Sequence, residues 1–181
     1  EVYRWVEVTG ELPLNVAVSL KVDELSAVML LAGTFVPMLI VVHAAQTLHD
    51  DPACCRFFAA VSLQLFAMLL LLLSTNFLMV LLCWQLAALG GDLLNGIRSE
   101  LTASAAAARK AFLVGRAADL FFIIGIFLIW TTFGSLDFSE VLGDSGKLAQ
   151  LLGENQPADV LRRNRATLNV ICFCLFAGAA G

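Results

Sequence analysis

Charged residues are scarce in this sequence of 181 residues, where aspartate, glutamate, lysine and arginine together make up 14%. An average soluble domain holds about a quarter charged residues. Hydrophobic residues reach 60% and the mean hydropathy is +0.86, so the composition excludes an ordinary soluble domain and predicts a membrane protein in contact with a lipid bilayer. With a formal net charge of −4, we expect no nucleic-acid partner.

Motifs for redox, metal and nucleophilic chemistry are also lacking. The two histidines, His43 and His49, form no cluster with cysteines, and no C-x-x-C occurs among the five cysteines at 54, 55, 83, 172 and 174. No glycine-rich nucleotide loop and no nucleophile elbow is present. We therefore expect no metal ion and no cofactor on this chain. His43, at the end of the first apolar run, suits an interfacial polar position better than a proton relay.

Long apolar runs are what the sequence has in abundance. A helix that rises about 1.5 Å per residue needs about 20 residues to cross a hydrocarbon core of about 30 Å. Four runs predict complete spans at about residues 24–45, 56–74, 77–95 and 103–133. A fifth run, 166–181, is too short to be finished, and we expect the sequence to be an amino-terminal fragment of a longer protein. The predicted fold class is all-α, a polytopic transmembrane helix bundle with four complete spans and a truncated fifth.

Polar segments precede and connect the spans. Residues 1–22 carry alternating apolar positions and predict an extramembrane lead with a short strand. The turn at 74–76 has three residues, so the second and third spans should be antiparallel neighbours. The polar loop 134–165 should contain a short surface helix around residues 146–152.

The basic residues give no preference for one membrane orientation. The positive-inside rule gives weight to lysine and arginine near the ends of spans. Four lie on one side, Arg56, Arg98, Arg109 and Lys110, and six on the other, Arg4, Lys21, Lys147, Arg162, Arg163 and Arg165. Once residues close to span ends are given more weight, the two totals are near-equal.

The fourth span contains two charges inside its apolar run. Counted from Lys110, Arg116 lies about 9 Å deep and Asp119 about 13 Å deep, near the middle of a core of about 30 Å. Residues three apart lie on one helical face, so Arg116 and Asp119 can form an ion pair. Two interpretations stay open: a structural ion pair that holds the span to its neighbours, and part of an ion or proton path.

The third span carries an amide and a carboxylate in "CWQLAALGGDLL". Gln85 lies about 12 Å from the end at Asn76, close to the depth of Asp119, and a water-bridged contact between the two spans is allowed. Asp92 lies on the same face about 10 Å further along, where it approaches the opposite surface. An interfacial carboxylate is therefore the favoured interpretation of Asp92.

Three stretches in this order resemble a known family: "VDELSAVML", "HDDPACCRFFAAVSLQLFAMLLLLLSTNFLMVLLCWQ" and "ARKAFLVGRAADLFFIIGIFLIWTTFGSLDF". They are similar to the amino-terminal part of subunit L of bacterial respiratory complex I, a family homologous to the large Mrp-type sodium/proton antiporter subunit. The resemblance implies an antiporter-like fold with inverted five-helix repeats and discontinuous helices, and residues 23–181 would form part of one such domain.

The resemblance also implies roles for individual residues. In the family, a glutamate after the tryptophan of the third span pairs with a lysine on a later, broken helix and controls proton movement. The arginine and aspartate of the fourth span belong to a hydrophilic axis that connects half-channels. By position, Trp84 and these proton-path candidates match: Lys110, Arg116, Asp119 and Asp23.

Two positions depart from the family pattern. The family glutamate is Gln85 here, and Gly115 stands where an asparagine or threonine is usual. Glutamine is close to glutamate in shape and forms hydrogen bonds, but it cannot carry a charge at physiological pH. Asp92 could replace the carboxylate on the same face, although its position nearer the surface argues against that.

The leading hypothesis is a proton-translocating, redox-inert membrane subunit of NADH:quinone oxidoreductase in the bacterial inner membrane. NADH, quinone, flavin and iron–sulfur clusters would be bound elsewhere in the complex, and the partners would be other membrane subunits and protons or sodium ions. Two alternatives use related chains: a cation/proton antiporter subunit of Mrp type, and the membrane subunit of an energy-coupled inorganic-carbon uptake complex.

Overall fold

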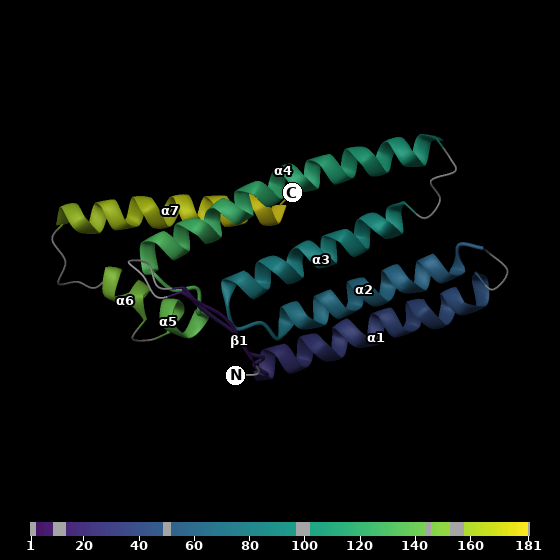
Figure 1. The fold of residues 1–181 in the computed structure, drawn as a ribbon, viewed down its shortest axis with the longest axis horizontal. Coiled ribbons are helices and arrows are strands. Elements are labelled where there is room, and N and C mark those ends of the chain that lie inside the picture. Colours follow the sequence, from purple (N-terminus) through teal and green to yellow (C-terminus); the bar gives the residue numbers. More distant parts are fainter. Residues whose placement is uncertain are drawn as a thin grey trace. The chain divides into compact units, whose positions relative to one another are not determined.

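The computed structural model describes residues 3–8, 14–48, 52–96, 102–143, 146–152 and 158–180 (Figure 1). Four described helices are long and apolar enough to cross a membrane, which confirms the predicted number of complete spans. They are α1 (Glu24–Thr47), α2 (Cys54–Leu72), α3 (Phe77–Asn95) and the Arg109–Phe133 part of α4 (Thr102–Phe133). The remaining elements are β1 (Tyr3–Val8), β2 (Leu14–Val18), α5 (Phe138–Leu142), α6 (Lys147–Leu152) and α7 (Ala158–Ala180).

The chain divides into two compact units, and α3 and α4 each contribute to both. Unit 1 consists of Glu1–Leu20, Ser74–Leu81 and Arg116–Gly181, and unit 2 of Lys21–Leu73 and Leu82–Gly115.

Unit 2 is built from antiparallel apolar helices. α1 and α2 contact each other and run in opposite directions (Figure 1). The backbone of α1 begins at Asp23, whose N–H donates to Ser26 Oγ at 2.6 Å and whose carbonyl accepts from Ala27 N at 2.9 Å. α3 approaches α2 at Gly90, where an added Cβ would lie 2.8 Å from Gln64 Cβ. The expectation that the second and third spans are antiparallel neighbours is confirmed.

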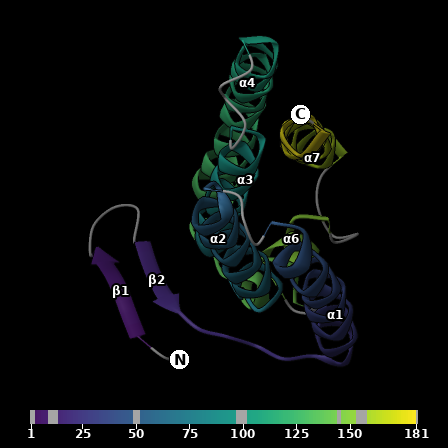
Figure 2. The same cartoon turned by 90° about the vertical axis from the view of Figure 1, so that its right-hand side faces the viewer.

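Unit 1 begins with a β-hairpin rather than a single strand. β1 and β2 pair in antiparallel register from Tyr3 opposite Val18 to Val8 opposite Leu14, with an irregularity between Arg4 and Val6 (Figure 2).

The turn before α3 is held by neighbours from the two other parts of unit 1. Asn76 is buried and caps the helix, because its Oδ1 accepts from Met79 N at 2.7 Å. Thr75 lies 2.6 Å from Ser19 through the two hydroxyl oxygens, and its carbonyl accepts from Phe138 N at 3.0 Å. Phe77 N donates to Leu136 O at 2.9 Å. These contacts determine where α3 begins.

The second half of α4 packs against α7. A Cβ added at Gly125 would lie 2.9 Å from Leu175 Cδ2, and one added at Gly178 would lie 2.6 Å from Phe122 Cβ. The two backbones therefore approach closely at these glycines. α7 begins at Ala158, eight residues before the apolar run that starts at 166, so its first turns are polar.

The polar segment after α4 is more ordered than its composition indicates. The short surface helix expected around residues 146–152 is α6, which confirms that prediction. α5 was not expected. Asp137 caps it by accepting from Ser139 N at 3.0 Å, and Val141 within it is 2% exposed. Lys147 lies 3.9 Å from Glu140 through Nζ and Oε2 and links α6 to α5.

Candidate polar axis in the membrane spans

The expected ion pair of the fourth span is present. Arg116 Nη2 lies 3.2 Å from Asp119 Oδ2, one turn apart on α4. The carboxylate side chain is 9% exposed and the guanidinium side chain 34%. The helix itself positions the pair, because residues three apart face the same direction. The pair therefore forms within one element and needs no distant partner to assemble it.

Asp119 lies on the buried face of α4. The buried apolar side chains of this helix recur at helical spacing after it: Phe122, Ile126, Ile129 and Phe133. Phe122, one turn from Asp119, is the residue that meets Gly178 of α7. The carboxylate thus extends the inward-facing stripe of α4, whereas an Asp on the opposite face would point to lipid.

The pair leaves hydrogen-bonding capacity in an apolar segment. Within the described part of the chain, Asp119 Oδ2 is buried and accepts no hydrogen bond, and its close partner is the charge of Arg116. Buried polar atoms are nearly always hydrogen-bonded, so this acceptor has capacity for a further hydrogen bond. Chemically, a carboxylate can take up and release a proton, whereas a guanidinium stays protonated.

Gln85 and Asp92 lie on α3 in unit 2, and both are partly exposed. Asp92 is in the last turn of α3, where its carbonyl accepts from Gly96 N at 3.0 Å. The last turn of α3 lies at the end of this span, and that position agrees with the interfacial interpretation of Asp92. Asp119 belongs to unit 1, and its water-bridged contact with Gln85 stays a prediction.

Lys110 and Asp23 lie outside the ion pair. Lys110 is exposed at the start of the apolar part of α4. Asp23 precedes α1 and lies 3.3 Å from Lys21 through Oδ1 and Nζ, with both side chains exposed. Its contacts are those of a residue that begins a helix. His43 is exposed on α1, and His49 lies outside the described residues.

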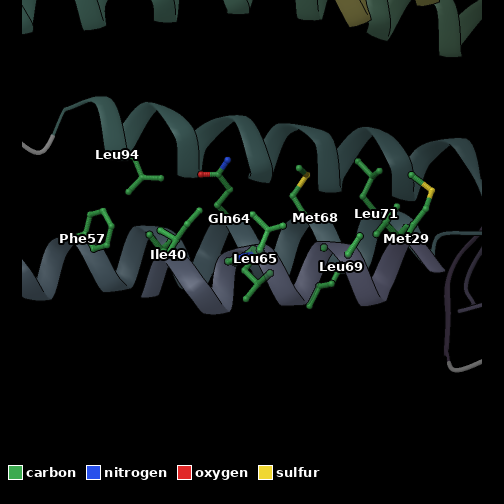
Figure 3. Close-up of a pocket in the computed structure, with 15 residues that line it drawn as sticks. Met29, Ile40, Phe57, Gln64, Leu65, Met68, Leu69, Leu71 and Leu94 are labelled. Carbon is green, nitrogen blue, oxygen red and sulfur yellow. The ribbon is translucent and has the colours of Figure 1, made fainter. Parts of the chain in front are cut away.

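Gln64 is a polar residue in mid-span that the sequence analysis did not single out. It lies ten residues into α2, about 15 Å deep at about 1.5 Å per residue, close to the middle of the core. Gln64 Nε2 is 4.0 Å from the position of an added Cβ on Gly91, and Figure 3 shows the amide turned towards α3. The depth arithmetic used for Gln85 would have identified it.

Comparison with known proteins gives two family matches. Residues 5–58 match the model described as NADH-ubiquinone oxidoreductase (complex I), chain 5 N-terminus. Residues 74–180 match the model described as NADH:quinone oxidoreductase/Mrp antiporter, TM.

Curated relatives match along nearly the whole chain. NADH-quinone oxidoreductase subunit L of Rickettsia conorii is 30% identical over 98% of this chain and 25% of its own length. Its counterpart from Mycobacterium tuberculosis is 30% identical over 99% of the chain and 25% of its own length. The chloroplastic NAD(P)H-quinone oxidoreductase subunit 5 of Zygnema circumcarinatum is 34% identical over 96% of this chain and 23% of its own length. The chain thus spans about a quarter of the length of the curated relatives it matches.

Proposed function

The chain belongs to the NADH:quinone oxidoreductase/Mrp antiporter family of transmembrane subunits, and from this premise we propose that it is part of a proton-translocating membrane subunit of an NADH:quinone oxidoreductase. In this proposal the chain couples electron transfer elsewhere in the complex to proton movement through polar groups inside its spans.

One observation carries the proposal: the ion pair of Arg116 and Asp119 within the apolar part of α4. A charge at the centre of a lipid-facing helix costs about 2.5 to 3.5 kcal/mol, and ionisable groups in spans are therefore rare and mostly functional. Asp119 is buried on the inward face of the helix and keeps an acceptor atom available for a proton or a water molecule. It is the residue we assign to proton transfer.

The other parts of the hypothesis follow from the same assignment. The chain would be redox-inert, with NADH, flavin, iron–sulfur clusters and quinone on other subunits, and these subunits would be its partners. Lys110 and Gln85 would belong to the same polar path, Gln85 as a hydrogen-bonding group at the position where the family has glutamate. In a bacterium the complex would lie in the inner membrane.

The two alternatives are less favoured. A cation/proton antiporter or a carbon-uptake subunit would use the same fold without electron transfer. The relatives reported above instead carry the names of quinone oxidoreductase subunits.

Asp119→Asn in the full-length protein tests the assignment. The substitution preserves shape but removes the exchangeable proton, so we expect proton translocation to fall at least about tenfold, as for the loss of a group that transfers protons. The complex should still assemble, which is checked by purifying it intact. Translocation is measured as dye quenching in vesicles energised with NADH.

Glu140→Gln is the matched control, because Glu140 is an exposed carboxylate outside the spans that also has a cationic partner. It should leave translocation unchanged. Normal translocation by Asp119→Asn would reduce the pair to a structural role and contradict the proposal.

A further inference from the structure

An elongated apolar groove lies within unit 2 between α1 and α2. Its volume is about 520 Å³, within the range of small-molecule sites. Its lining reaches from Met29 to Ile40 on α1 and from Phe57 to Leu72 on α2, and Leu94 of α3 contributes at the Phe57 end (Figure 3). At about 1.5 Å per residue these stretches are about 16 and 22 Å long.

The dimensions and lining of the groove match a lipid tail. Half of a hydrocarbon core of about 30 Å is the depth that one leaflet's acyl chains fill, close to the length of the groove along α1. The lining is almost entirely apolar, and its one amide, Gln64, is turned towards α3. At Gly33 an added Cβ would be 3.8 Å from Leu72 and 4.0 Å from Leu69, so this glycine faces the two leucines of α2 at ordinary contact distance.

The ends of the groove differ in charge. Arg56 directly precedes Phe57, is exposed, and has no ion-pair partner among the described residues. Its long side chain can reach the headgroup layer while its stem stays beside the apolar surface. Near the Met29 end, Glu24 is exposed and the charge of Lys21 is matched by Asp23. A phosphate is therefore favoured at the Arg56 end.

From this geometry we propose that the groove between α1 and α2 binds a glycerophospholipid, with one acyl chain along Gly33 and Leu69 and the phosphate at Arg56. Basic residues at the mouths of pockets between spans are a recognised way to hold lipid phosphates. Phosphatidylethanolamine carries such a phosphate on two acyl chains and is the probe. The inference depends on α1 and α2 spanning a membrane and not on proton translocation.

The experiment uses phosphatidylethanolamine with a diazirine in one acyl chain. Full-length protein in its complex is placed in detergent micelles that contain a small fraction of this probe, irradiated, digested and mapped by mass spectrometry. We expect labelling of Leu65 and Leu69. Unlabelled phosphatidylethanolamine should compete this labelling away, whereas diacylglycerol with the same chains should not. Phe66, exposed on the same helix and outside the groove, reports bulk lipid and should be labelled under all conditions.

Two variants test the two parts of the site. Gly33→Phe fills the groove and should abolish the competable labelling of Leu65 and Leu69 while Phe66 is still labelled. Arg56→Gln should weaken competition by phosphatidylethanolamine up to about fivefold, the upper range for an exposed ion pair. Gly115→Phe is the matched control, since an added Cβ at Gly115 meets nothing within 4 Å, and it should change neither result.

The proposal is overturned if the groove residues are unlabelled in the wild-type protein, which would mean that another polypeptide segment covers them. It is also overturned if diacylglycerol competes as well as phosphatidylethanolamine, because the phosphate would then contribute nothing. If Gly33→Phe also loses the labelling of Phe66, the surface substitution Arg56→Gln decides: unchanged competition rejects the site, and weakened competition supports it.

Discussion

At the scale of single residues, Arg116 and Asp119 each stabilise the other in an apolar helix. Either charge alone would cost about 2.5 to 3.5 kcal/mol against lipid, and a distance of 3.2 Å between opposite charges offsets much of that cost. The same contact would serve a purely structural pair, so a useful test must separate stability from translocation.

Exchanging the two charges separates the effect on stability from the effect on translocation. The double variant Arg116→Asp with Asp119→Arg keeps an i,i+3 pair on the same face, so we expect the complex to assemble better than with either single reversal. Translocation should stay low, because the titratable carboxylate has moved from the buried position to the more exposed one. The measurements are the yield of intact complex and proton uptake per NADH oxidised, and full recovery of both would contradict a specific role for Asp119.

Gln85 gives a second prediction at this scale. Gln85→Glu introduces a titratable group in mid-span with little change of volume, so translocation should acquire a new dependence on pH. Gln85→Leu removes the hydrogen-bonding group of the proposed path and should lower translocation at every pH. The measurement is translocation rate against pH for both variants beside the wild type, and near-normal translocation with leucine would show that the amide is not required.

At the scale of elements, glycines decide which helices approach each other. Gly90 lets α3 meet α2 at Gln64, and Gly125 and Gly178 do the same for α4 and α7. In lipid, helix association depends on close packing and polar contacts, since the surrounding tails are as apolar as the side chains. A missing Cβ at these positions therefore stabilises the packing of a whole helix.

Gly90→Ala should accordingly destabilise the protein. The added Cβ would lie 2.8 Å from Gln64 Cβ and 3.0 Å from Gln64 Cα, and the backbone atom cannot move aside alone. We expect a loss of about 1 to 3 kcal/mol from overpacking, reduced by about 1 kcal/mol of gained helix propensity. The free energy of unfolding of the full-length protein is measured in detergent. Gly115→Ala, in open space, is the control and should be neutral or stabilising, and equal effects of the two substitutions would reject the packing argument.

At the scale of the whole molecule, four crossings determine which segments share a side of the membrane. The segment before α1, the turn between α2 and α3, and the segment after α4 should lie on one side. Contacts within unit 1 agree, because Ser19 meets Thr75 and Asn76 pairs with Asp137 in an antiparallel bridge.

Cysteine labelling tests this arrangement. In a full-length protein without its native cysteines, Glu140→Cys and Ala106→Cys place single thiols at exposed positions beyond opposite ends of the fourth span. A membrane-impermeant maleimide should label one from outside sealed vesicles and the other only after permeabilisation. Labelling of both thiols from the same side would show that the fourth span does not cross the membrane.

Features that depend on neighbouring residues follow from the sequence, and features that depend on distant residues do not. α3 begins at Phe77 as predicted, since a polar turn meets an apolar run there and Asn76 supplies the cap. The start of α7 at Ala158 was not foreseen, because a polar helix outside the bilayer has no hydropathy signal. α5 was missed for the same reason.

By itself, then, the sequence determined the membrane class, the four spans and the ion pair of α4, because hydropathy and i,i+3 spacing act along one helix. Only the tertiary structure decided that Asp119 faces inward beside the contact with α7, that Asn76 is buried in a turn held by two other segments, and that Gln64 meets α3 at a glycine. The physical reason is that burial and close approach depend on residues far apart in the chain, which no local period encodes.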